Sequence, residues 1–419
     1  MPLPATTRAI RPHWLNPERL RVYPRMVLAV IVLTAIAWMA RSKHLVDSRG
    51  KPIGYDFITF WAASHLALTH HAADAYNIPL IFKAENLAVP ASRGVFVWYY
   101  PPTFYLLILP LALLPYLLSY WVFTLTTLAV YLAAFRHLLR TGLQSYARPA
   151  LWCLAGFAGL WLNLFHGQNA FLTAALAAAA LLTLDTQPIL AGVFLGLLAI
   201  KPHLALLFPV VLIVIGAWRT LLTALITGST FLALGTAVLG VDTLKACLGS
   251  LRYARLFLEG GFLPWVKMPT VFALLRLLHV PVTAAYLVHG IVALLATAAV
   301  WRIWRVSQDR QLQSAVLMTA TFLISPYVFD YDLAWLAFPI AWLALLGLRD
   351  GWRPSEREAL VAAWVLPVAM SPVVKLTHLQ PAPFVLGWLL WLMLRRASSQ
   401  TLQKKWVPEN GATFSHRAF

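Results

Sequence analysis

The chain has 419 residues, of which 60% are apolar and only 11% are charged, and its mean hydropathy is +0.72. A water-soluble domain of this length cannot expose so much apolar surface, so the composition excludes one and indicates an integral membrane protein. The formal net charge of +18 does not indicate nucleic-acid binding, because the 33 Lys and Arg residues are scattered through the links between apolar segments and form no continuous basic face.

Long apolar segments recur along the whole chain and are separated by short charged links. Helices satisfy every backbone polar group within hydrocarbon, and the alternating ten-residue segments of a membrane barrel are not seen. The pattern therefore predicts an all-α polytopic membrane protein. Since a span needs about 20 residues, we predict twelve crossings near residues 24–41, 118–136, 149–166, 168–185, 188–201, 202–218, 219–240, 284–301, 312–326, 332–348, 358–374 and 381–395.

The distribution of Lys and Arg predicts the orientation of these spans. Basic links alternate with neutral ones, and the rule that basic links stay inside places both termini in the cytoplasm. We expect a cytoplasmic tail over residues 1–25, one transmembrane domain over 26–395 and a disordered cytoplasmic tail over 396–419. The location expected for such a protein is the bacterial inner membrane, with outer loops at 42–117 and 241–283.

The first outer loop has internal structure of its own. Aromatic and small residues at helical spacing predict a helix over residues 57–70, and a second short helix is expected over 78–87. Both would lie along the membrane surface. Residues 101–115 are apolar but contain four prolines, which remove helix donors, so we predict an interfacial or re-entrant helix there and no crossing.

Polar residues from distant parts of the chain fall on the outer side of the membrane in this topology, which predicts a cavity there. The candidates for its walls are Asp56, Tyr100, His166, Gln168, Asn169, Lys201, His203, Asp330, Tyr331 and Asp332. Each also has a purely structural interpretation. Asp56 and one of the later aspartates are in positions typical of helix caps, 166–169 is suited to a turn, and Lys201 can reach the interface as a snorkelling side chain.

The order of these motifs along the chain resembles that of glycosyltransferase family 87. The motifs are Tyr55-Asp56-Phe57, Tyr100-Pro101-Pro102, Gly167-Gln168-Asn169, Lys201-Pro202-His203, and Ser325-Pro326-Tyr327 with Tyr331-Asp332. Members of that family are polyprenyl-phosphate-mannose-dependent mannosyltransferases and relatives of the GT-C type. The resemblance covers roughly residues 25–395 and implies that the first outer loop carries the catalytic aspartate, which here is Asp56.

The resemblance also implies the chemistry. The donor would be a lipid-linked sugar phosphate within the bilayer, the acceptor a glycolipid or glycan, and mannose the expected sugar. Asp56 would accept the proton of the acceptor hydroxyl, and direct displacement would invert the anomeric centre. Lys201, with His203 and His166 behind it, would stabilise the departing phosphate. We expect Asp330 and Asp332 to bind sugar or acceptor hydroxyls.

No ligand pattern for the metal of a nucleotide-sugar enzyme is found, so neither a metal nor a cofactor is expected. Three alternatives stay open at this point. A relative could use another sugar, such as glucose or an aminopentose. A secondary transporter or lipid flippase would also have many spans, although its polar site would lie near the bilayer midplane. A scaffold subunit of an assembly is the third.

Overall fold

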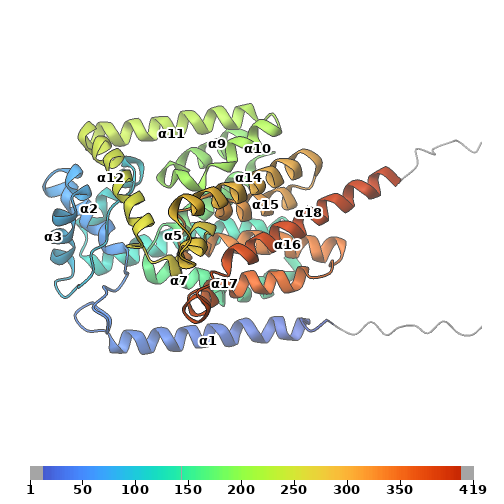
Figure 1. Cartoon of the computed structure of the whole chain (residues 1–419), viewed down its shortest axis with the longest axis horizontal. Helices are drawn as coiled ribbons and strands as arrows, with labels where there is room; N and C mark the ends of the chain where they lie inside the picture. Colours follow the sequence, from blue (N-terminus) through green and yellow to red (C-terminus); the bar gives the residue numbers. More distant parts are fainter. Residues whose placement is uncertain (1–12, 143, 407–419) are drawn as a thin grey trace, which may run out of the picture.

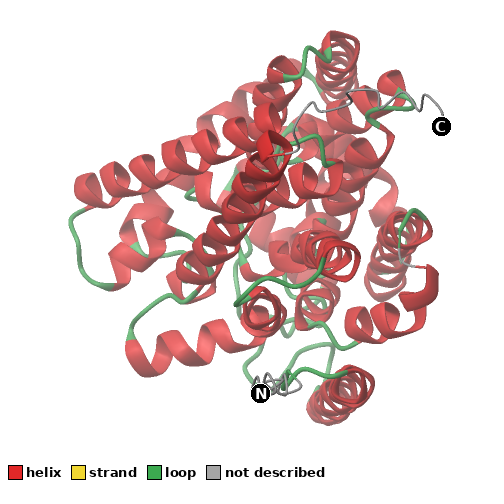
Figure 2. Cartoon of the chain, turned by 90° about the vertical axis from the view of Figure 1, so that its right-hand side faces the viewer, coloured by secondary structure: helices red, strands yellow, loops and turns green. Residues whose placement is uncertain are grey.

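The structure of the chain is a computed structural model that describes residues 13–142 and 144–406, and this part consists of helices and loops without a strand (Figures 1 and 2). The α-helices are α1 (Pro17–Arg41), α2 (Phe57–Thr69), α3 (Ile78–Ala88), α4 (Pro102–Ile108), α5 (Tyr116–Arg140), α6 (Ala147–Ala155), α7 (Ala158–His166), α8 (Ala170–Thr183), α9 (Pro188–Leu197), α10 (Leu207–Val214), α11 (Trp218–Leu239), α12 (Val241–Gly260), α13 (Val271–Leu277), α14 (Val282–Val306), α15 (Arg310–Ile324), α16 (Ala337–Asp350), α17 (Glu356–Thr377) and α18 (Ala382–Trp406). Short 3-10 helices are η1 (Ala72–Tyr76), η2 (Leu109–Leu113), η3 (Gln144–Tyr146), η4 (Leu198–Ile200), η5 (Pro202–Leu204), η6 (Trp265–Lys267) and η7 (Asp330–Leu336).

The all-α prediction is confirmed for the described residues, but the count of twelve crossings is not. Six helical segments there are long and apolar enough to cross a membrane, or seven if the bent pair α6 and α7 forms one span. The six are α1, α5, α11, α14, η7 with α16, and α17. The predicted crossing at 168–185 coincides with the 14-residue helix α8. Such a helix is only about 21 Å long, which is shorter than the hydrocarbon core.

Several boundaries differ from the sequence predictions. The segment 241–283, expected to be a loop, is largely helical and begins with the 20-residue helix α12. Helix α18 continues to Trp406, so the expected disordered tail begins with helix, and residues 407–419 lie outside the described part. Helix α1 begins at Pro17, where Asn16 caps it by accepting the backbone N–H of Arg19 at 2.9 Å.

The short helices predicted over residues 57–70 and 78–87 are confirmed as α2 and α3. Helix α2 packs against α3 and η2 and buries an apolar face that includes Phe57 and Phe60. The proline-rich segment forms α4 and η2, a short apolar unit that does not reach the length of a span. Ser64 of α2 donates a hydrogen bond to the carbonyl of Leu109 at 2.6 Å, which ties the two units together.

The bundle has two different ends. In Figure 1, α2, α3 and α12 gather at one end, whereas the first residues of α1 and the last turns of α18 lie at the other.

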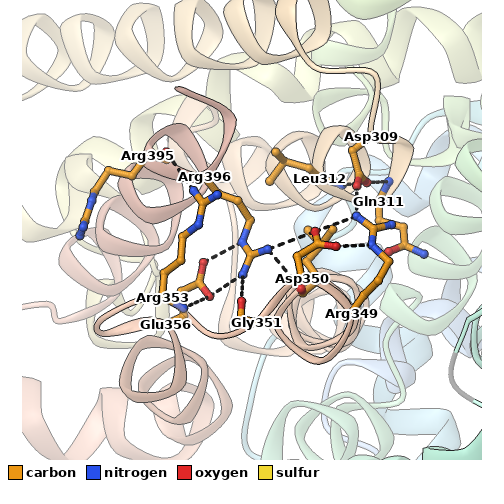
Figure 3. Close-up of polar contacts among 11 residues, drawn as sticks. Asp309, Gln311, Leu312, Arg349, Asp350, Gly351, Arg353, Glu356, Arg395 and Arg396 are labelled. Carbon is orange, nitrogen blue, oxygen red and sulfur yellow. Dashed lines mark hydrogen bonds and ion pairs between the residues drawn. The ribbon is translucent and has the colours of Figure 1, made fainter. Parts of the chain in front are cut away.

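A network of ion pairs joins α15, α16, α17 and α18 (Figure 3), and these helices meet it at the end of the bundle away from α2 and α3 (Figure 1). Arg396 is fully buried and donates two hydrogen bonds of 2.8 Å to the carboxylate of Glu356, which is also fully buried. Arg349 pairs with Asp350 at 2.7 Å and with Asp309. A bidentate buried pair has a fixed geometry, so the network sets how these four helices meet.

Candidate functional site

Asp56 follows a tight turn at the start of α2. Gly54 has φ of +89° and Tyr55 has φ of +39°, and a side chain at Gly54 would collide with Tyr120 at 2.9 Å. A positive φ is unfavourable for a tyrosine, and strained residues of this kind cluster at functional sites. The Tyr55 hydroxyl donates to Asp47 Oδ2 at 2.8 Å, which helps to hold the turn.

The side chain of Asp56 does not cap α2. No hydrogen bond joins its carboxylate to the backbone of that helix. Instead, Oδ2 accepts a hydrogen bond from Nε2 of Gln168 at 3.0 Å, and Oε1 of Gln168 accepts one from the Tyr100 hydroxyl at 2.8 Å. The sequence interpretation of Asp56 as a helix cap is therefore wrong. Gln168, which Tyr100 orients in turn, holds this carboxylate in a defined orientation.

The turn between α7 and α8 brings Gln168 to Asp56. Gly167 has φ of +57°, and a Cβ there would lie 2.6 Å from Cβ of Phe57. Only glycine fits a left-handed position so close to α2. The segment 166–169 is thus a turn, as one interpretation predicted, and it also places the side chain of Gln168 beside Asp56.

His166 and Lys267 form a second polar contact nearby. Nδ1 of His166 lies 2.8 Å from the carbonyl oxygen of Leu162, which can only accept, so Nδ1 carries the proton. Nε2 then accepts a hydrogen bond from Nζ of Lys267 at 3.1 Å. The imidazole ring packs against Tyr55 and Tyr331, at centroid distances of 5.2 and 5.6 Å.

Lys201 forms a buried ion pair. Its Nζ donates to Oδ1 of Asp332 at 2.5 Å, with side-chain exposures of 4% and 0%. Nζ also lies 5.1 Å from the centroid of the Tyr331 ring. The other oxygen of Asp332 accepts the backbone N–H of Phe329 at 3.1 Å. Because Asp332 compensates its charge, Lys201 does not snorkel to an interface.

One cavity of about 1440 Å³ unites most of these groups. Seven of the ten predicted site residues line it: Asp56, Tyr100, His166, Gln168, Lys201, His203 and Tyr331. His203 lies edge-on to Tyr327 at 5.8 Å, and its Nε2 is buried without a hydrogen-bond partner. Asp56, which precedes α2, and Lys201, which follows α9 and η4, therefore share a single hollow.

Three predicted residues do not line this cavity. Asp332 reaches it only through Lys201. Asp330 is buried, and its Oδ1 accepts the N–H of Tyr331 at 2.9 Å. Asn169 is fully buried behind the wall, and neither polar atom of its amide has a partner. The structure therefore does not bring these three side chains to the cavity wall.

The charges on the cavity wall are mostly positive. Among the described residues that line it, Asp56 is the only carboxylate, whereas Arg49, Lys51, Lys201, Arg255 and Lys267 are cations. Burial raises the pKa of Tyr100 far above its ordinary value, and the nearby charges of Tyr327, Asp332 and Asp56 raise it further. The Tyr100 hydroxyl therefore stays protonated and remains a hydrogen-bond donor.

Sequence reasoning missed several residues of the wall. Lys267 is not among the predicted site residues, because nothing in the sequence pairs it with His166, which precedes it by 101 positions. The leucines of α12 were missed because that helix was taken for a loop. Their spacing was the available signal: Leu244, Leu248, Leu251 and Leu258 recur on one helical face and all line the cavity.

No three His, Cys, Asp or Glu side chains of the described residues cluster in a way that could hold a metal ion. Comparison with known proteins gave one positive finding. Residues 98–326, more than half of the chain, match the sequence profile of glycosyltransferase family 87. No curated protein and no solved structure matched. The matched range contains Tyr100, His166, Gln168, Lys201 and His203, while Asp56 lies before it. With its apolar helices and this match, the chain belongs to glycosyltransferase family 87 and is a multi-pass membrane glycosyltransferase.

Proposed function

We propose that the protein transfers a hexose, with mannose as the expected sugar, from a polyprenyl-phosphate donor to a glycolipid or glycan acceptor at the outer face of the membrane. One observation carries the proposal. The cavity combines a single carboxylate, several cations and an apolar wall. These are the groups that a base, a phosphate and a hydrocarbon chain require.

Asp56 is suited to act as the general base. Gln168 occupies one carboxylate oxygen, Oδ2, and no protein group of the described chain is hydrogen-bonded to Oδ1. An acceptor hydroxyl that reaches Oδ1 can transfer its proton there as its oxygen bonds to the anomeric carbon. A positioned base of this kind contributes roughly a hundred- to ten-thousand-fold to a rate.

The lipid part of the donor fits the wall formed by α12 and the segments beside it. The leucines at 244, 248, 251 and 258 present an apolar face to the cavity, and Leu206 and Leu232 line it as well. A prenyl chain is hydrocarbon and gains from contact with such a surface. The phosphate would then lie among the cations that line the same hollow.

The arrangement favours inversion. A retaining double displacement needs a second carboxylate as nucleophile, close to the first. Asp332 is engaged by Lys201 and by the N–H of Phe329, and Asp330 does not line the cavity. We therefore propose one direct displacement. The bond from the acceptor oxygen to the anomeric carbon forms, the bond from that carbon to the phosphate oxygen breaks, and prenyl phosphate departs with the electron pair.

We also propose that the cavity opens toward the outer side of the bacterial inner membrane and that both termini are cytoplasmic. In Figure 1 the first residues of α1 and the last turns of α18 lie at the opposite end of the bundle from α2 and α3, which supports this orientation. The twelve-crossing topology remains part of the proposal, with α8, α9, α10, α15 and α18 as the additional crossings.

The test is the Asp56→Asn variant in membranes supplied with radiolabelled polyprenyl-phosphate sugars. Transfer should fall by at least about a hundred-fold because asparagine cannot accept the proton. The amide keeps an oxygen for Gln168, so donor binding should persist. Asp74→Asn is the matched control, since Asp74 lies in η1 of the same outer segment but outside the cavity. Full transfer by Asp56→Asn would remove this residue from the mechanism.

A further inference from the structure

Resting on the proposed function, we infer that Lys267 is the cation that binds the departing phosphate and that His166 positions it. The sequence pointed to Lys201 for this role. In the structure, however, the charge of Lys201 is already compensated by Asp332.

The cations of the cavity differ in whether a carboxylate already compensates them. Lys201 is paired with Asp332 at 2.5 Å, and Arg255 with Glu259 at 2.6 Å. Lys267 has no carboxylate within ion-pair distance in the described part of the chain, and its one hydrogen bond there goes to Nε2 of His166. The buried carboxylate of Asp330 is close enough to interact with the charge of Lys267 through space but forms no ion pair with it. An ammonium group has three donors, so two remain for a ligand.

The position of Lys267 places that charge beside the proposed base. Its Nζ lies 5.9 Å from the centroid of the Tyr55 ring, and Tyr55 directly precedes Asp56. Its hydrogen-bond partner His166 lies two residues before Gln168, which holds the Asp56 carboxylate. Arg49 and Lys51 also line the cavity, but Lys51 is directed at the Phe96 ring, 5.2 Å from its centroid.

The protonation state of His166 supports a positioning role. Because Nδ1 donates to the carbonyl of Leu162, the neutral ring presents only the lone pair of Nε2. That lone pair is occupied by Lys267. The histidine therefore has no donor for a phosphate and instead orients the ammonium group. The backbone of η6 is fixed in turn, as the N–H of Lys267 donates to the carbonyl of Pro264 at 2.8 Å.

The change of charge during the reaction explains why an uncompensated cation is needed. The donor is a phosphodiester with one negative charge, and the departing prenyl phosphate is a monoester that carries two. A fixed cation that meets the developing charge stabilises the transition state and the product more than the donor. Lys201 stabilises the developing charge of the phosphate less strongly, because Asp332 already offsets the charge of Lys201.

The experiment compares two probes with the same hydrocarbon chain, farnesyl phosphate and its ethyl diester. Their binding to the full-length protein in detergent is followed by quenching of tryptophan fluorescence at fixed salt. In Lys267→Gln, affinity for the monoester should fall by about ten- to a hundred-fold, as expected for loss of a charged hydrogen bond. Affinity for the diester should fall by less than about ten-fold. Lys267→Arg should recover much of the difference between the probes.

Two further variants separate positioning from folding. His166→Phe keeps a ring against Tyr55 and Tyr331 but cannot accept from Lys267, so it should reduce the preference for the monoester in the same direction. Lys245→Gln is the matched control, because Lys245 is exposed on α12 and pairs with Asp242 outside the cavity. It should bind both probes as the wild type does.

The outcomes distinguish the two proposals. Unchanged monoester binding by Lys267→Gln, with wild-type binding intact, would overturn the role of Lys267 and leave the proposed function standing. An equal loss for monoester and diester would also overturn it, since a general defect of the cavity would then explain the result. If the wild type bound neither probe, the lipid-phosphate donor itself would be refuted.

Discussion

At the scale of single residues, the same type of side chain takes different states in this cavity. Asp56 is half-buried, held by one amide and open on its other oxygen, whereas Asp332 is fully buried with both oxygens engaged. The two lysines differ in the same way. Lys201 forms an ion pair with a carboxylate, whereas Lys267 forms none in the described part of the chain and is hydrogen-bonded to His166. The capacity of each residue for chemistry follows from these partners and not from its identity.

Glu85 carries a testable pH dependence. It is fully buried in α3, where one carboxylate oxygen accepts the N–H of Phe96 at 3.2 Å and the other has no partner. Burial raises its pKa to about 9, and the charge of Asp56 adds to the increase. The folded protein thus holds a proton that the unfolded chain releases above about pH 4.5, so stability falls as pH rises from about 4.5 to about 9.

Glu85→Gln should abolish this dependence, because glutamine resembles the protonated form at every pH. The melting temperature of the variant in detergent should match that of the wild type near pH 5 and exceed it by a growing margin at pH 7 and pH 8.5. At pH 7 the free energy of unfolding of the variant should be higher by up to about 3 kcal/mol. Glu18→Gln is the control, since Glu18 is exposed on α1. A pH-independent difference between wild type and Glu85→Gln would contradict the assignment.

At the scale of elements, the turns and the helix ends do most of the positioning. The turn between α7 and α8 places Gln168, η6 places Lys267, and the turn before α2 places Asp56. The motif of residues 166–169 was recognised in the sequence, but its contact with the first outer segment depends on how closely α7 approaches α2. That approach requires glycine at position 167.

The ion-pair network at the other end of the bundle gives an element-scale prediction. Arg396→Met leaves the buried carboxylate of Glu356 without its partner, so we expect a loss of about 3 to 5 kcal/mol in stability. The double variant Arg396→Met with Glu356→Met removes both charges and should recover most of that loss. Thermal unfolding in detergent measures both. Arg252→Met is the control, since Arg252 is exposed on α12.

A double variant as unstable as the single one would contradict this account, because the cost would then come from lost packing and not from an unpaired buried charge. Transfer activity at low temperature should survive in the double variant, since the network lies at the end of the bundle away from α2 and α3 (Figure 1).

At the scale of the whole molecule, the proposed orientation can be tested by labelling. Ser48 is exposed near the turn that precedes Asp56, and Thr186 is exposed where α8 ends, at the opposite end of that helix from Gln168. In a chain whose Cys153 and Cys247 are replaced by serine, Ser48→Cys should react with a membrane-impermeant maleimide on intact spheroplasts. Thr186→Cys should react only after permeabilisation. Labelling of both from outside would refute the orientation.

The sequence by itself determined the class of the molecule and much of its site. Composition and repeated apolar segments are enough to specify a helical membrane protein, because backbone groups in hydrocarbon leave few other folds. The order of the polar motifs identified the family. The topology inferred from the charge bias predicted a shared cavity, and seven of the ten candidate residues line one.

Only the tertiary structure decided which groups are paired and how long each helix is. Hydropathy does not determine where a helix begins and ends, so the span predicted over 168–185 is longer than helix α8, and the helical segment α12 was predicted to be a loop. Lys201 and its partner Asp332 are 131 positions apart, and Lys267 and its partner His166 are 101 positions apart. No local sequence pattern predicts contacts over such separations. Charge compensation depends on distances in space, and these exist only once the helices have packed.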